Sequence, residues 1–238
     1  RFNNPAYRKP FLSNQIKLLP QTMGFCSTKT DFLGMDAATQ NNRANIPDSA
    51  SPFLLNSASS YCPNSSFVHM LTDTHTHLYS EAFDEDRAEM MQRAFNKGIT
   101  RFFIPAIDSS YTNAMYQLEK EYPKNVFLMM GLHPTSVKEN FEEELNFVED
   151  QFKKRSFFAV GEIGIDLYWD KSTLEIQKKA FKRQIQLAKK HNLPIVIHCR
   201  ESFDEIFEVL ETESDEKLFG IFHCFTGTYE QAIRAIGF

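Results

Sequence analysis

A short segment near the start of the regularly patterned part of the chain carries residues that bind metal ions. In Asp73-Thr74-His75-Thr76-His77 the two histidines are two residues apart. Alternate side chains of a strand share one face, so Asp73, His75 and His77 are predicted to point the same way from a strand over residues 71–75. Such a strand would deliver two imidazoles to one metal ion. A strand with two incidental histidines is the competing interpretation.

Three further candidate ligands each follow an apolar segment elsewhere in the chain: Glu162, His198 and His223. A carboxylate buried at such a position is costly without a cation or hydrogen bonds. Taken singly, Glu162 could be an exposed loop acid and each histidine a core residue, but together with the first pair they favour a metal centre. Imidazole and carboxylate ligands without thiolates suit Zn, Mn or a similar divalent ion in a catalytic site. Asp166 is equally compatible with a functional role and with a cap or loop role.

The elements that must position these residues alternate regularly. Apolar segments predict six strands, and helix-like sequence separates each from the next. One helix is expected to begin with Asp84 as N-cap and to stop at Gly98, and another is expected to bury Phe141, Leu145, Val148 and Phe152. The predicted strands are residues 71–75, 100–105, 126–131, 157–162, 194–198 and 219–223.

Alternating strands and helices predict an α/β fold with a parallel sheet, either doubly wound or closed as a (β/α)8 TIM barrel. The candidate ligands are placed at the carboxyl ends of several strands, and a barrel brings such ends together at one active site, so the barrel is favoured. Only about six βα units are present, whereas a complete barrel needs eight and about 250 residues. We therefore expect an incomplete barrel over residues 70–238, ending short at its C-terminus, with unpaired edges on its first and last strands.

The first 69 residues differ in composition from the rest. They are rich in Asn, Ser, Thr and Pro without apolar periodicity, so residues 1–69 are predicted to be a disordered or non-native extension. A transit peptide is a weaker interpretation, because Pro5, Pro10 and Pro20 prevent a clean amphipathic helix.

Charge and cysteine usage narrow the class of protein. The net charge is −5, and residues 1–69 hold six basic against three acidic residues, so the remainder is more acidic than the whole. Such a body argues against a broad basic nucleic-acid surface but leaves room for phosphates held by metal ions. The four cysteines are widely spaced, which predicts free thiols and a cytoplasmic location, and no apolar run of about 18 residues predicts a membrane span.

The chain resembles the TatD family of metal-dependent deoxyribonucleases, which are amidohydrolase-like TIM barrels. The resemblance covers Met70 to Phe238. It rests on five motifs in order: Asp73-Thr74-His75-Thr76-His77, Gly131-Leu132-His133-Pro134, Gly161-Glu162-Ile163-Gly164-Ile165-Asp166, Pro194-Ile195-Val196-Ile197-His198-Cys199-Arg200 and Phe222-His223-Cys224-Phe225-Thr226-Gly227.

The resemblance implies a hydrolase that cleaves phosphodiester bonds at 3′ ends of DNA, and in some members RNA, for DNA catabolism. It implies two divalent ions, Mg, Mn or Zn, that activate a shared water and clamp the attacking and leaving oxygens. By this resemblance His75 and His77 hold the first ion, Glu162 bridges both, and His198 and His223 hold the second.

The resemblance also implies supporting roles. His133, Asp166 and Arg200 are expected to contact phosphate or to orient ligands, although an ordinary surface ion pair is an alternative for Arg200. Apart from the resemblance, Tyr168 and Trp169 in the loop after the fourth predicted strand are expected either to stack a base or simply to pack the rim.

The family's aspartate near the last strand, a ligand of the first ion, has no counterpart among these residues, so the 238-residue chain is expected to be poorly active. Two rival interpretations remain: an amidohydrolase for a C–N or lactone bond, and a non-catalytic fragment or metal-binding interaction protein. We expect a monomer without a membrane partner.

Overall fold

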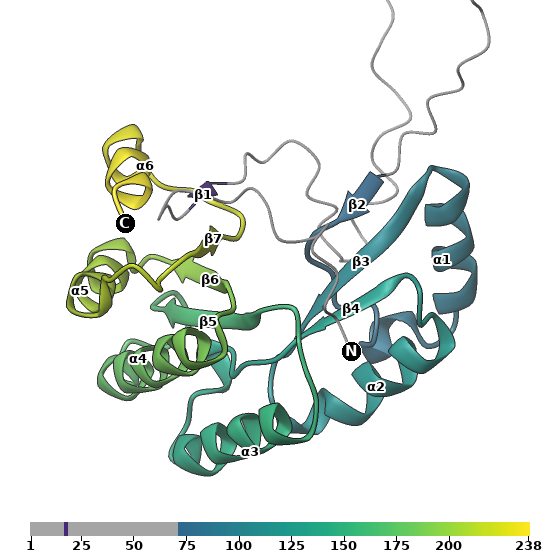
Figure 1. Ribbon diagram of the computed structural model, residues 1–238, viewed down its shortest axis with the longest axis horizontal. Coiled ribbons are helices and arrows are strands. Elements are labelled where there is room, and N and C mark those ends of the chain that lie inside the picture. Colours follow the sequence, from purple (N-terminus) through teal and green to yellow (C-terminus); the bar gives the residue numbers. More distant parts are fainter. Residues whose placement is uncertain (1–16, 19–70) are drawn as a thin grey trace, which may run out of the picture.

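The computed structural model describes residues 17–18 and 71–238, and in this part of the chain parallel strands are enclosed by helices. Figure 1 shows the helices arranged along the outer side of the strands. The strands are β1 (Lys17–Leu18), β2 (Leu71–Asp73), β3 (Ile99–Pro105), β4 (Val126–Met129), β5 (Val160–Asp166), β6 (Ile195–Arg200) and β7 (Gly220–Phe222). The helices are α1 (Arg87–Asn96), α2 (Thr112–Glu121), α3 (Phe141–Lys154), α4 (Leu174–His191), α5 (Phe203–Glu213) and α6 (Tyr229–Ile236). Three short 3₁₀ turns are η2 (Glu81–Phe83), η3 (Ser109–Tyr111) and η4 (Pro134–Ser136).

The strands form two parallel sheets that meet side by side. One sheet has the order β2-β3-β4 and the other β5-β6-β7-β1, and a parallel bridge between Met130 and Val160 joins β4 to β5. From β2 to β7 spatial order therefore follows chain order, as in a TIM barrel, and helices cross over between neighbours. Among the described residues six of these strands fit the barrel pattern, which confirms the predicted fold class.

The edge of the last strand differs from the expectation. β7 pairs in parallel with Lys17–Leu18, so this edge is not left unpaired over those two residues. The pairing falls within the predicted extension, residues 1–69, and the rest of that extension lies outside the described residues. A sequence without apolar periodicity gave no sign of β1, because two residues of backbone pairing need no amphipathic pattern.

The helices bury the faces that periodicity predicted. α3 buries Leu145, Val148 and Phe152, spaced three and four residues apart along one face, whereas Phe141, which was also expected to be buried, is only partly buried at the first position of the helix. α1 ends one residue before Lys97, and Gly98 follows with a positive φ of 84°, a conformation that glycine adopts freely. The start of α1 was predicted two residues too early, because Asp84 closes the preceding turn and Asp86 occupies the N-cap position.

All six predicted strands have somewhat different bounds in the structure, and two of these differences concern the site. The strand predicted over residues 71–75 ends at Asp73, and the strand predicted over 157–162 runs instead from Val160 to Asp166. All seven residues of β5 are buried and its pairing with β6 continues to Asp166, so the apolar segment before Val160 is mainly an approach to the strand. Glu162 is therefore the third residue of β5 rather than the last residue of the strand, as predicted.

No helix among the described residues combines the length and the apolar character needed to cross a membrane.

Candidate metal centre

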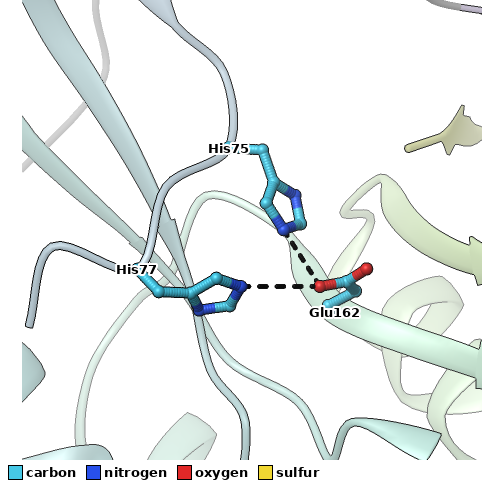
Figure 2. A group of neighbouring side chains, drawn as sticks. All are labelled: His75, His77 and Glu162. Atoms are coloured by element: carbon cyan, nitrogen blue, oxygen red, sulfur yellow. Dashed lines mark ion pairs between the residues drawn. The ribbon is translucent and has the colours of Figure 1, made fainter. Parts of the chain in front are cut away.

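A buried carboxylate surrounded by imidazoles lies at the centre of the site. Glu162 is 2% exposed, and its Oε2 atom is 2.9 Å from Nε2 of His75 while its Oε1 atom is 3.0 Å from Nδ1 of His198. Oε2 is also 3.7 Å from Nε2 of His133 and 3.8 Å from Nε2 of His77. Figure 2 shows His75 and His77 approaching the carboxylate from one side. Side chains from three separate segments therefore converge on Glu162, as the strand-end argument predicted.

The first pair of histidines lies in a loop rather than in a strand. β2 ends at Asp73, and the rings of His75 and His77 lie edge to face with centroids 5.2 Å apart. The backbone N–H of His75 donates to Asp73 Oδ1 at 3.1 Å, and the N–H of Thr76 donates to the carbonyl of Phe103 at 3.2 Å. These bonds hold the loop against β3. The two imidazoles converge because the loop is pinned, and Asp73 supports the backbone of His75 rather than its ring.

The second group of close ligand atoms comprises His133, Glu162 and His198. His133 Nε2 lies 3.2 Å from His198 Nδ1, whereas the ring of His223 stacks on the ring of His75 at 3.5 Å and 8°. Sequence reasoning paired His198 with His223 and gave His133 a supporting role. The structure brings all of these residues together but places His133 among the nearest ligand atoms.

Asp166 connects the centre to the loop after β5. It is the last residue of β5, is 2% exposed, and its Oδ2 atom lies 2.8 Å from Nε2 of His198. Its Oδ1 atom accepts hydrogen bonds from the backbone N–H groups of Tyr168 at 3.0 Å and Trp169 at 3.4 Å. The side chain of Gln177 on α4 in turn holds the backbone of Asp166 through its N–H and its carbonyl. Asp166 therefore orients His198 and shapes the turn that follows.

Arg200 lies at the end of β6, outside the cluster of imidazoles. Its side chain is exposed, and its guanidinium carbon lies 3.8 Å from the ring centre of Tyr168 and 5.5 Å from that of Trp169. The surface ion pair that was the alternative for Arg200 does not occur among the described residues; a cation–π contact takes its place.

The environment sets different charge states on the ligands. Burial lowers the pKa of His77, His133 and His223 to about 4, which keeps these imidazoles neutral near pH 7. Burial opposes ionisation of Glu162, but the surrounding histidines outweigh burial and hold its pKa well below the usual range. Burial also disfavours a charged His198, but hydrogen bonds with two carboxylates raise its pKa to about 9.

The donor set fits divalent metal ions. Two groups of ligand atoms share Glu162, and within each group the atoms lie within 4.8 Å of one another. Among the described residues, His75 Nδ1 is buried without a hydrogen-bond partner. The neutral imidazoles of His77, His133 and His223 and the ionised Glu162 are in the protonation states that a metal ion requires, whereas His198 would release a proton on binding one. Nitrogen and oxygen donors without thiolates match Zn, Mn or Mg rather than a structural zinc site.

Sequence reasoning missed three side chains that hold the ligands in place. Tyr79 OH lies 2.8 Å from His77 Nδ1, Thr135 Oγ1 lies 2.7 Å from His133 Nδ1, and Gln177 holds Asp166. Tyr79 and Thr135 each follow their histidine by two residues, a spacing that could have pointed to them. Gln177 gave no such signal, because it is eleven residues from Asp166 and a buried helix face does not reveal its partner.

Parallel strands in barrel order, with histidines and a buried glutamate gathered around one point, define a protein of the TIM-barrel type with a candidate metal centre. The chain belongs to the TatD family, since the family described as TatD related DNase matches residues 72–238.

Proteins similar to this chain include metal-dependent hydrolases and named exonucleases. The uncharacterized metal-dependent hydrolase YabD of Bacillus subtilis is 39% identical over 164 residues, which cover 68% of this chain and 64% of YabD. The 3′-5′ ssDNA/RNA exonuclease TatD of Pantoea ananatis is 29% identical over 159 residues, covering 67% of this chain and 61% of that protein. This chain thus spans less than two thirds of the length of either relative.

A solved structure supports the fold independently. The crystal structure of YjjV, a TatD homologue of Escherichia coli K12, matches with a TM-score of 0.65 and 28% identity over 71% of this chain and 66% of that chain. An amidohydrolase of Saccharomyces cerevisiae matches with a TM-score of 0.59 at 17% identity, which supports the fold alone.

Proposed function

We propose that the protein hydrolyses phosphodiester bonds of DNA, and of RNA, with two divalent metal ions held around Glu162. The observation that carries this proposal is the sharing of one buried carboxylate by two groups of ligand atoms. A shared carboxylate is suited to holding two ions close together, the arrangement used for in-line displacement at phosphorus. The name of the Pantoea relative, 3′-5′ ssDNA/RNA exonuclease, supports action at 3′ ends.

Under this proposal His75 and His77 hold one ion with Glu162. His198 and Glu162 would hold the second ion, and His133 and His223 are the two candidates for its further ligand. The 3.7 Å distance from His133 Nε2 to Glu162 Oε2 supports His133, while the family resemblance favours His223, whose ring stacks on His75. When bound, the ions supply Lewis acidity, which lowers the pKa of a water molecule and offsets the charge of a phosphate.

The side chains of this chain position the reactants. Asp166 accepts the Nε2–H of His198, which leaves Nδ1 directed toward Glu162. Arg200 presents an exposed guanidinium two residues after His198 on β6, where it can bind a phosphate through two parallel hydrogen bonds. A role in DNA catabolism and a cytoplasmic location belong to the same proposal, and the free thiols of Cys199 and Cys224 suit a reducing compartment.

A substrate panel tests the proposal directly. The protein is incubated with Mn²⁺ and, separately, 3′-labelled single-stranded DNA, RNA, a small amide and a lactone. We expect release of nucleotides from the labelled 3′ end, abolished by a chelator and by Glu162→Gln. The comparison with Glu162→Gln decides the outcome. Hydrolysis of the amide or lactone alone, or nuclease turnover that persists in Glu162→Gln, would refute the proposal.

A further inference from the structure

An exposed aromatic pair lies beside the metal centre together with a cation. We call Tyr168, Trp169 and Arg200 the aromatic platform. The two rings lie edge to face with centroids 4.8 Å apart at 89°, and the guanidinium of Arg200 covers one face of Tyr168. Trp169 is 71% exposed and Tyr168 49% exposed. Single exposed aromatic residues need no explanation, but an adjoining pair with an arginine at the mouth of a site is typical of a binding surface.

The aromatic platform is joined to the metal centre by one carboxylate. Asp166 contacts His198 through Oδ2 and fixes the backbone of Tyr168 and Trp169 through Oδ1. Trp169 also forms one wall of a surface hollow that reaches Asp166. The hollow is lined by Pro134, Thr135, Lys138, Asp166, Trp169, Asp170, Thr173 and Gln177. A substrate held at the centre would therefore extend over the platform.

We propose that the aromatic platform binds one nucleotide of a single-stranded nucleic acid, with the base on the exposed indole of Trp169 and a phosphate on Arg200. This inference rests on the proposed function and specifies its substrate. Every base has a face that can stack on an indole, so the contact is tolerant of sequence. Bases in a duplex already stack on one another, which makes a single strand the better ligand.

Trp169 is the single tryptophan of the chain, so its fluorescence reports the platform alone. Metal-free protein in a chelator is titrated with an oligothymidylate and with an abasic sugar-phosphate oligomer of equal length. We expect saturable quenching by the oligothymidylate and about tenfold weaker binding of the abasic oligomer, since stacking contributes about 1–3 kcal/mol per base. Equal binding of the two oligomers, or no change in emission, would overturn the inference.

Variants separate the platform from the hydrolysis itself. Trp169→Leu is expected to raise KM for single-stranded DNA about tenfold more than KM for methyl p-nitrophenyl phosphate. Tyr229→Leu, which removes another exposed aromatic ring on α6, is the matched control and should leave both values at the wild-type level. Phosphodiester hydrolysis without fluorescence quenching refutes only nucleotide binding by the aromatic platform. Quenching without hydrolysis refutes the proposed function and supports nucleotide binding by the platform.

A second observation concerns Tyr79, which is 2% exposed and contacts a candidate ligand. Its hydroxyl donates to the carbonyl oxygen of Pro105 at 2.9 Å and lies 2.8 Å from Nδ1 of His77. A phenol has one proton, and a carbonyl can only accept, so the hydroxyl oxygen must accept from His77. His77 therefore carries its proton on Nδ1, and the lone pair of Nε2 faces Glu162.

We infer that Tyr79 is a positioning residue that fixes the tautomer and the ring orientation of His77 for metal binding. The hydrogen bond made by one ring nitrogen determines which nitrogen is free to bind a metal. Loss of the hydroxyl leaves either tautomer accessible. Outer partners of this kind typically change metal affinity by about 10–100-fold.

Nitrogen-15 NMR of the metal-free protein tests this inference without activity. Wild-type His77 is expected to show the Nδ1–H tautomer, and Tyr79→Phe a mixture, with about tenfold weaker Mn²⁺ binding in chelator competition. The control is Tyr116→Phe, which removes a hydroxyl that donates to Gln151 between α2 and α3. The inference is overturned if Tyr79→Phe retains the Nδ1–H form and wild-type affinity, or if Tyr116→Phe weakens Mn²⁺ binding equally.

Discussion

Replacement of Gly164 by alanine should destabilise the protein and weaken its metal binding together. Gly164 lies on β5 between Glu162 and Asp166, its φ is +141°, and a Cβ there would lie 2.0 Å from the carbonyl oxygen of His198. Ordinary van der Waals contacts begin at 3.4 Å, so the carbonyl group of His198 would have to move about 1.4 Å away from the new Cβ atom. The backbone strain costs about 1–3 kcal/mol and the overpacking about as much again. We expect the free energy of unfolding to fall by about 2–6 kcal/mol.

The same displacement should move His198, whose ring contacts Glu162. Metal ligands tolerate deviations of only about 0.2 Å, so a shift of this size is expected to remove most of the Mn²⁺ affinity. Urea unfolding followed by circular dichroism measures the stability, and chelator competition measures the affinity.

The matched control is Gly220→Ala, where a Cβ would lie 2.3 Å from the carbonyl oxygen of Ile195 at the start of β6. This clash is similar in size but lies at the other end of the strand from His198. Gly220→Ala should lose stability and retain most of the affinity. Wild-type stability of Gly164→Ala, or equal losses of affinity in both variants, would refute the reasoning.

Three further outcomes are expected. Glu162→Gln should lower metal content and activity by at least 100-fold while the far-ultraviolet circular dichroism stays unchanged, because it removes the shared ligand; full metal occupancy would contradict this. His198→Ala should reduce the metal content from two ions to one by elemental analysis, and unchanged stoichiometry would count against its assignment. Burial acts to raise the pKa of Glu213, but the ion pairs with Lys182 and Lys189 outweigh burial and lower this pKa. The ionised carboxylate therefore stabilises the fold at pH values above its pKa in the unfolded chain. This stabilisation is lost as the pH falls through its lower pKa in the folded protein. Glu213→Gln should therefore cost about 1–3 kcal/mol at pH 7 and little at pH 3 in urea unfolding, and equal costs at both pH values would be inconsistent with it.

Much of the fold follows from local pattern. Apolar residues at helical spacing, such as Leu145, Val148 and Phe152, bury one face of α3 as expected, because side chains three and four residues apart share a face whatever surrounds the helix. The alternation of strands and helices likewise required parallel pairing. Strand bounds were less predictable, since Asp166 belongs to β5 only through its pairing with Arg200 on β6.

The candidate site was likewise predictable only in part. Sequence by itself indicated a candidate metal centre, because several histidines and a glutamate that each follow an apolar segment favour one together, although each could singly be a core or loop residue. Tertiary structure decided which of them are neighbours: it placed His133 beside His198, stacked His223 on His75 and set Tyr79 against His77. The physical reason is that a strand's pattern fixes which face a side chain occupies, whereas the distance between side chains on different strands depends on register and loop packing.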